Sequence, residues 1–187
     1  MTSNLDVRSF VRLVFLAQGG RIEGRTKLQK TVYFVGLLTD QLDDLGYRPH
    51  YYGPYSPAVA DAVDTDRSLG FLDQETLVIG SDARGFERAR YDYRLTDDGE
   101  SIAKKYSTQR SDIYQKIERA CRTLQSAGAI DYMEMSIAAK TVHILKASGQ
   151  PLTESAIKST AQEFGWKLEE KDILEAGAYL KKLNLVQ

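Results

Sequence analysis

Four cations near the start of the chain are the side chains best placed to bind phosphate. Arg21 precedes a stretch that we predict to be helical from residue 26, and Arg25, Lys27 and Lys30 lie at its start. Contacts from arginine and lysine to phosphate supply most of the sequence-independent affinity of proteins for nucleic acid. We predict that these side chains form a cationic edge that contacts double-stranded DNA. The alternative is a solvated helix face with no such role.

A second group of arginines lies between two predicted strands. Residues 81–90 carry Arg84, Arg88 and Arg90. The arginine side chain is well suited to entering a minor groove or spanning phosphates. Acidic residues in the same stretch dilute the positive charge. We predict DNA contact here as well, with an ordinary solvated hairpin as the alternative.

The helix that usually reads DNA in a helix-turn-helix protein is acidic in this chain. Asp61, Asp64 and Asp66 are accompanied only by Arg67 in the predicted third helix. Three carboxylates would be repelled by a DNA duplex. Either DNA is bound through the cationic groups above, or Asp61 and Asp64 belong to a surface that docks onto a basic partner protein.

Four tyrosines surround the Gly-Pro turn at residues 53–54: Tyr47, Tyr51, Tyr52 and Tyr55. Aromatic residues are enriched at protein interfaces. A turn flanked by proline must also be pinned in place, and large rings do that well. We interpret Tyr51 and Tyr55 as rings that cap the core, and Tyr47 and Tyr52 as candidates for a protein interface.

Residues that could support catalysis or bind a metal are few. The sequence has no nucleophile elbow, zinc-protease motif, phosphate-binding loop or dinucleotide-binding turn. Cys121 lies in a predicted amphipathic helix and His143 on an apolar one, while the adjacent carboxylates at residues 97–98 are typical of helix starts. We therefore expect no enzymatic activity, no metal site and no cofactor.

Composition and charge narrow the class of protein. The 187 residues are 42% hydrophobic, which is enough for a packed core, and the net charge of −1 gives no overall attraction to nucleic acid. Charge is asymmetric locally, because residues 1–35 are mainly basic and residues 36–75 mainly acidic. No apolar run is long enough to span a membrane and the first residues lack the apolar core of a signal peptide, so we expect a cytoplasmic protein.

Hydrophobic periods predict the order of elements in the first half. We expect helices at residues 5–17, 26–38 and 57–69, strands at 76–79 and 91–95, and a further helix at 97–106. The expected N-caps are Asn4, Ser56 and Thr96. This order is typical of a winged helix-turn-helix domain, which we place at residues 1–107 with residues 77–96 as the wing.

The second half is predicted to be helical. Helical periods cover residues 112–126, 132–147, 153–165 and 169–183. Residues 145–157 resemble residues 16–28 in pattern, which suggests a second helix-turn-helix without a wing. We expect residues 108–187 to form a helical domain that makes the protein a homodimer. The fold class is therefore mainly α with a small β-hairpin.

Three motifs carry a resemblance to a known family. They are GRTKLQKTVYF at residues 24–34, YYGPYS at 51–56 and YRLTDDG at 93–99. In order and spacing they resemble the YwgA-like family of uncharacterised prokaryotic proteins and, more distantly, the Panacea domain of SocA-type antitoxins. The resemblance covers the first half of the chain and implies a winged-helix-like fold. For the Panacea relatives it implies antitoxins or adaptors that bind protein, and it implies no catalytic residues.

These observations predict a non-enzymatic winged-helix protein that binds double-stranded DNA and regulates transcription. The rival hypothesis is a protein-binding module, antitoxin-like or an adaptor, in a toxin–antitoxin or phage-defence system. In that case the acidic third helix and the tyrosine turn bind the partner. A winged helix is compatible with either role.

Overall fold

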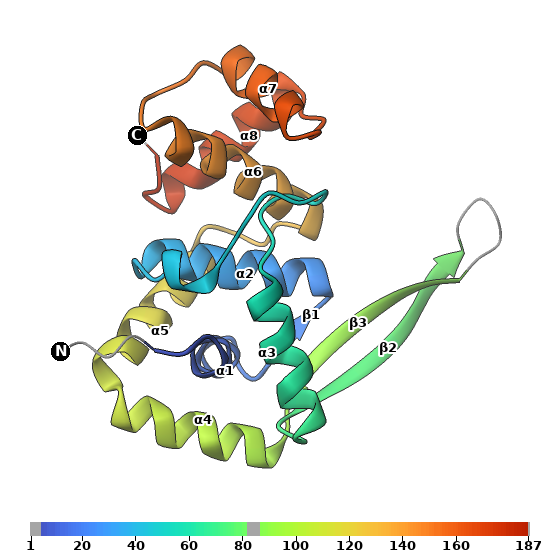
Figure 1. Ribbon diagram of the computed structural model, residues 1–187, viewed down its shortest axis with the longest axis vertical. Coiled ribbons are helices and arrows are strands. Elements are labelled where there is room, and N and C mark those ends of the chain that lie inside the picture. The colour runs from blue at the N-terminus through green and yellow to red at the C-terminus, as the bar shows by residue number, and fades with distance from the viewer. Residues whose placement is uncertain (1–4, 82–86, 187) are drawn as a thin grey trace.

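The computed structural model describes residues 5–81 and 87–186 and is mainly helical (Figure 1). A small antiparallel sheet of three strands lies beside the helices of the first half. The predicted fold class is confirmed at this level, as mainly α with a small β component.

The elements follow the predicted order, with additions. The first half contains α1 (Val7–Ala17), β1 (Arg21–Glu23), α2 (Arg25–Leu38), the short 3-10 helix η1 (Asp43–Leu45), α3 (Pro57–Ser68), β2 (Leu72–Ser81), β3 (Glu87–Leu95) and α4 (Asp97–Gln109). The second half contains α5 (Ser111–Ser126), α6 (Tyr132–Ser148), α7 (Glu154–Glu163) and α8 (Glu170–Lys182).

Polar side chains set several helix starts through local hydrogen bonds. Ser56 caps α3 and Thr96 caps α4, as predicted, and each accepts a bond from the amide three residues later. The expected cap of α1, Asn4, is wrong. Asp6 takes that role, so α1 begins at Val7.

A third strand, β1, lies where we predicted only a glycine-rich connection. It pairs with β3, with Ile22 opposite Tyr93, and the order in the sheet is β1-β3-β2. The strand has three residues and only Ile22 is buried, so its sequence shows no repeated alternation of apolar and polar residues. The strand is therefore visible only once its pairing partner is in place.

The hairpin is longer than predicted. β2 begins at Leu72 rather than at residue 76, and β3 begins at Glu87 rather than at residue 91. Beyond the three residues that pair with β1, the two strands project from the body (Figure 1). We define this projecting part, residues 75–81 and 87–91, as the arm. The residues that sequence analysis did not assign to the strands, including 73–75 and 87–90, are mostly polar, so they show no apolar period.

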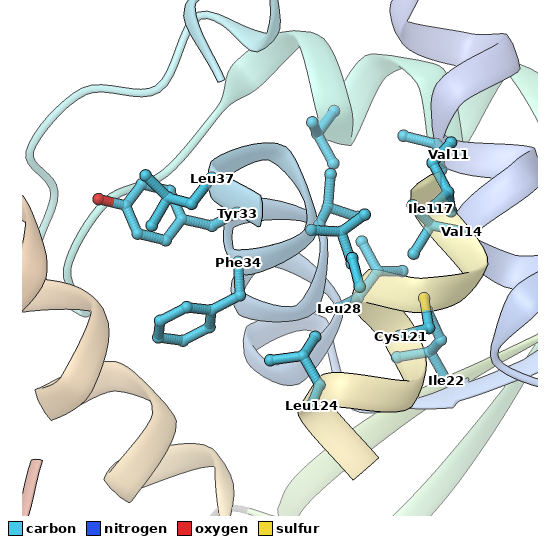
Figure 2. Packing of buried hydrophobic residues seen from close by; sticks show 14 of the residues in the cluster. Val11, Val14, Ile22, Leu28, Tyr33, Phe34, Leu37, Ile117, Cys121 and Leu124 are labelled. Atoms are coloured by element: carbon cyan, nitrogen blue, oxygen red, sulfur yellow. The ribbon is translucent and has the colours of Figure 1, made fainter. Parts of the chain in front are cut away.

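Helix α2 lies within the larger cluster of buried apolar side chains. Val14 of α1, Leu28 of α2 and Ile117 of α5 share this interior (Figure 2). Leu180 of α8 belongs to it as well. The core therefore continues across residues 107 and 108, although the boundary that we placed there stays a prediction. A smaller cluster around Trp166 lies among α6, α7 and α8.

No helix within the described ranges is both long enough and apolar enough to cross a membrane.

Candidate interaction surfaces

Several of the cations predicted to bind DNA are held by the protein's own carboxylates. Asp92 of β3 is buried and accepts hydrogen bonds from Arg21 at 3.2 Å, from Arg90 at 2.8 Å and from the Gly24 amide at 3.1 Å. Glu23 lies 3.7 Å from both arginines. Burial alone would raise the pKa of Asp92, but the bonds from Arg90 and Arg21 hold that pKa below its ordinary value. The charges of these two arginines are therefore largely balanced by carboxylates of the protein itself.

Arg25 and Lys27 at the start of α2 remain exposed. The guanidinium of Arg25 stacks over Tyr91, 4.1 Å from the ring centre, and its Nε donates to the Tyr93 hydroxyl at 3.0 Å. Lys27 forms no ion pair with a described residue. The predicted cationic edge thus keeps two accessible cations, one of them fixed against the sheet.

Lys30 does not belong to this edge, and its prediction as a phosphate contact is wrong. Its side chain is only 2% exposed, and its Nζ donates to the Pro54 carbonyl oxygen at 2.7 Å. Burial, together with the nearby Lys140, lowers the pKa of Lys30 to about 7. The amine is therefore an internal anchor and cannot reach a phosphate group.

The arm carries both signs of charge. Arg88 is exposed, Arg90 is held as described above, and Arg84 lies outside the described residues. On the same face, Arg94 lies 3.4 Å from Asp73 of the neighbouring strand. Arginines and carboxylates are thus interleaved across the hairpin.

The acidic surface of α3 is smaller than predicted. Asp61 and Asp64 are exposed, and Asp64 pairs with Arg67 at 3.0 Å. Asp66 differs, because it is fully buried and accepts two hydrogen bonds from the guanidinium of Arg12 in α1. The third carboxylate expected on this surface therefore forms an internal ion pair with Arg12, and this pair connects α3 to α1.

Residues 48–56, which we define as the tyrosine turn, are fixed by hydrogen bonds from distant elements. Gln29 of α2 exchanges two bonds with the backbone of Ser56, in addition to the lysine bond described above. Trp166, between α7 and α8, donates its indole Nε1 to the His50 carbonyl oxygen at 2.7 Å. The turn is therefore held from both halves of the chain.

The turn is held mainly by hydrogen bonds to its backbone, and two of its tyrosine rings take no part in this. Tyr51 is 73% exposed and Tyr52 is 48% exposed, with 4.9 Å between their ring centres. The interpretation of Tyr51 as a ring that caps the core is wrong. Tyr55 is half-buried and packs against His50.

Tyr47 is the tyrosine that contributes to the core. Its ring makes an edge contact with Tyr33, and its hydroxyl donates to the Gln29 carbonyl oxygen at 2.7 Å. Burial raises the pKa of Tyr47 well above its ordinary value. The polar end of the side chain is therefore used internally, and the role of Tyr47 in a protein interface stays a prediction.

Helix α6 packs against the tyrosine turn. Tyr132 and Met133 are exposed in the first turn of the helix. Gly53 packs against the same helix, and a Cβ there would lie 3.4 Å from the Ser136 carbonyl oxygen, one helical turn after Tyr132. We define Tyr51 and Tyr52, whose ring centres lie 4.9 Å apart, as the tyrosine patch. Sequence reasoning did not anticipate the contact of the turn with α6, since nothing local links the two.

Cys121 and His143 are enclosed by apolar surroundings. Cys121 is fully buried in α5, and burial raises the pKa of its thiol to about 11. His143 is half-buried against the rings of Phe164 and Trp166, and burial lowers its pKa. Within the described part of the chain, no three His, Cys, Asp or Glu side chains gather in a way that could hold a metal ion.

No protein-family model matches this chain, and no curated protein matches it at a significant level.

Proposed function

We propose that this protein is a non-enzymatic, protein-binding module of winged-helix type, and that the tyrosine patch is its contact surface. The observation that carries the proposal is the exposure of Tyr51 and Tyr52 on a turn whose backbone is held from both halves of the chain. Rings presented on an already ordered backbone lose little conformational entropy on binding, and aromatic residues are frequent hot spots.

The order and pairing of the first elements support the winged-helix assignment. Helices α1, α2 and α3 precede the hairpin β2–β3, and the short β1 after α1 pairs with β3. In this proposal the hairpin is the wing and α3 is the recognition helix. The exposed Asp61 and Asp64 suit α3 to a basic protein surface better than to a DNA duplex.

The positions of the cations also favour a protein partner. Arg21 and Arg90 are balanced by Asp92, and Lys30 is internal. Affinity for DNA grows with the number of phosphates that free cations neutralise, so each cation that is buried or paired with a carboxylate of the protein lowers this affinity. An antitoxin-like or adaptor role in a toxin–antitoxin or phage-defence system rests on the resemblance of the first half to Panacea proteins.

Co-expression with the products of neighbouring genes, followed by calorimetry on the purified pair, tests this proposal. Tyr51→Ala combined with Tyr52→Ala should weaken the complex about 1,000-fold, because hot-spot residues contribute roughly 2 kcal/mol each and every 1.4 kcal/mol is a factor of ten. Leu174→Ala, at an exposed apolar position of α8, is the matched control and should bind like the wild type. A chain that elutes alone with every neighbour, or a double variant with full affinity, would exclude the patch.

Double-stranded DNA is the second candidate partner, favoured by the winged-helix arrangement with exposed Arg25 and Lys27 at the start of α2. The protein would then be a regulator that also uses Arg88 of the arm. Fluorescence anisotropy with random duplex DNA at low salt measures this directly. Absence of binding, or binding that survives Arg25→Ala combined with Lys27→Ala, rules out this route to DNA.

A further inference from the structure

A groove of about 700 Å³ runs between α6 and α8. The segment that joins α6 to α7 and the residues after α8 complete its walls. These helices form the end of the molecule opposite α4 (Figure 1). The groove shares no residue with the tyrosine patch, so the protein contact proposed above leaves it unused.

The floor of the groove is apolar. It is lined by side chains of α6, α7 and α8, including Val142, Leu145, Ile157 and Ile173. Leu174 at the rim is 63% exposed. Sites for small molecules are typically clefts of roughly 300–1,000 Å³ with a mainly apolar lining and a few polar groups. The size and lining of this groove are those of such a site.

Gly177, within α8, keeps the groove open. A Cβ at this position would meet no other atom within 4 Å, so no neighbouring side chain requires glycine here. Its φ angle is not positive, so the backbone conformation does not require glycine either. Glycine inside a helix is less favourable than alanine, and its usual purpose is to let another group approach the backbone closely.

The groove also holds charged groups that the protein itself does not use. Lys146 and Lys181 line the groove and form no ion pair within the described ranges. Glu154 is the single carboxylate among the described lining residues. Two lysines without partners attract an anion.

We propose that this groove binds an apolar carboxylate. The aliphatic part lies on the apolar floor against α8 at Gly177, and the carboxylate pairs with Lys146 and Lys181. A ligand of this class satisfies the apolar surface and the unpaired lysines together.

A second copy of the chain is a poorer occupant. Two identical surfaces that meet about a twofold axis bring the same residues of both copies into one interface. Lys146 and Lys181 of each copy would then face the same pair, with only Glu154 to offset them. Like charges at an interface are unfavourable.

Isothermal titration calorimetry with decanoate as the probe tests the site. We expect saturable binding at one site, and binding at least about tenfold weaker for decan-1-ol and for decyltrimethylammonium, which lack the negative charge. Gly177→Leu should abolish decanoate binding, because the new side chain fills the groove. Lys146→Gln combined with Lys181→Gln should weaken it about tenfold. Lys105→Gln, an exposed lysine of α4 without an ion pair in the described ranges, is the matched control.

Circular dichroism and thermal unfolding of each variant establish that the fold is retained. Equal binding of the three amphiphiles, or decanoate binding that survives Gly177→Leu, overturns the proposal. Sedimentation velocity provides an independent check on the occupant. A dimer that Gly177→Leu converts to monomer, in a protein that does not bind decanoate, would assign the groove to a second copy and also overturn the proposal.

Discussion

At the scale of single residues, one buried carboxylate organises the edge of the sheet. Asp92 accepts hydrogen bonds from Arg21 and Arg90 and from the amide of Gly24, which precedes α2. It therefore ties the sheet to the start of α2 and keeps two arginines close to the protein surface. The loss of this carboxylate would both loosen that junction and release the arginines.

Replacing Asp92 by asparagine should lower the free energy of unfolding by about 1–2 kcal/mol, because its donors lose a charged acceptor. Asp73→Asn removes the exposed partner of Arg94 and should cost less than about 0.5 kcal/mol. Urea unfolding followed by the fluorescence of Trp166 measures both. Equal costs would show that Asp92 behaves as an ordinary surface carboxylate.

The contribution of Asp92 should also depend on pH. Because its pKa is lower in the folded protein than in the unfolded chain, the stabilisation is present at neutral pH. It is lost as the pH falls through the folded pKa, below the ordinary value of about 4. The difference in free energy of unfolding between the wild type and Asp92→Asn should therefore disappear at acid pH.

The contribution of Lys30 to stability should change at higher pH than that of Asp92. Burial lowers its pKa to about 7, so above that pH the unfolded chain binds more protons than the folded protein. The free energy of unfolding should therefore rise as the pH increases from 6 to 9, by on the order of 1 kcal/mol. Lys30→Met should remove this rise in urea unfolding, whereas Lys105→Met should keep it. Identical pH profiles for the wild type and Lys30→Met would contradict the assignment.

At the scale of elements, two helical glycines have opposite roles. Gly99 of α4 packs against the backbone of Phe71, and an added Cβ would overlap the Phe71 carbonyl oxygen. Gly177 of α8 faces open space. The first glycine is required by the approach of two elements, and the second is required by nothing in the protein itself.

Alanine substitutions should therefore change stability in opposite directions. Gly177→Ala should raise the free energy of unfolding by about 0.5–1 kcal/mol, because alanine is the better helix former. Gly99→Ala should lower it by about 1–3 kcal/mol, because the helix must move away from Phe71. Thermal unfolding of the two variants provides the comparison. A destabilised Gly177→Ala would mean that the groove is closed in solution.

Local sequence determined where several elements begin but not where the strands do. Ser56 and Thr96 cap their helices through bonds to amides three residues away, so the sequence carries the whole interaction. The arm and β1 depend on pairing between segments distant in the sequence. Their own residues show little apolar alternation, which is why both were missed or predicted too short.

At the scale of the whole molecule, the two halves share one core. Ile117 and Leu124 of α5 pack with Val14 and Leu28 from the first half (Figure 2). The indole of Trp166 is bonded to the tyrosine turn of the first half. A fragment ending at residue 107 would expose the faces of α1 and α2 that these residues cover.

We therefore expect residues 1–107 alone to lack a cooperative unfolding transition. In the whole chain, helicity followed by circular dichroism and the fluorescence of Trp166 should change together in one transition. A fragment that unfolds cooperatively, or two separated transitions in the whole chain, would instead support independent domains divided at residue 107.

The sequence by itself determined the helical class, most helix boundaries and the caps at Ser56 and Thr96. These features depend on periods and hydrogen bonds that lie within a few residues of each other. Only the tertiary structure decided which charges and rings remain available. Lys30 is internal because it meets Pro54, and Asp66 is internal because it meets Arg12.

Exposure is a property of packing between distant segments, and the same reason explains the tyrosines. Tyr51 is exposed because Trp166 and α2 hold the backbone of its turn, which leaves the ring without an internal role. The groove between α6 and α8 likewise depends on how those helices pack. A lysine or tyrosine has the same local pattern whether it faces solvent or a distant carbonyl group, so the candidate surfaces emerged only from the folded chain.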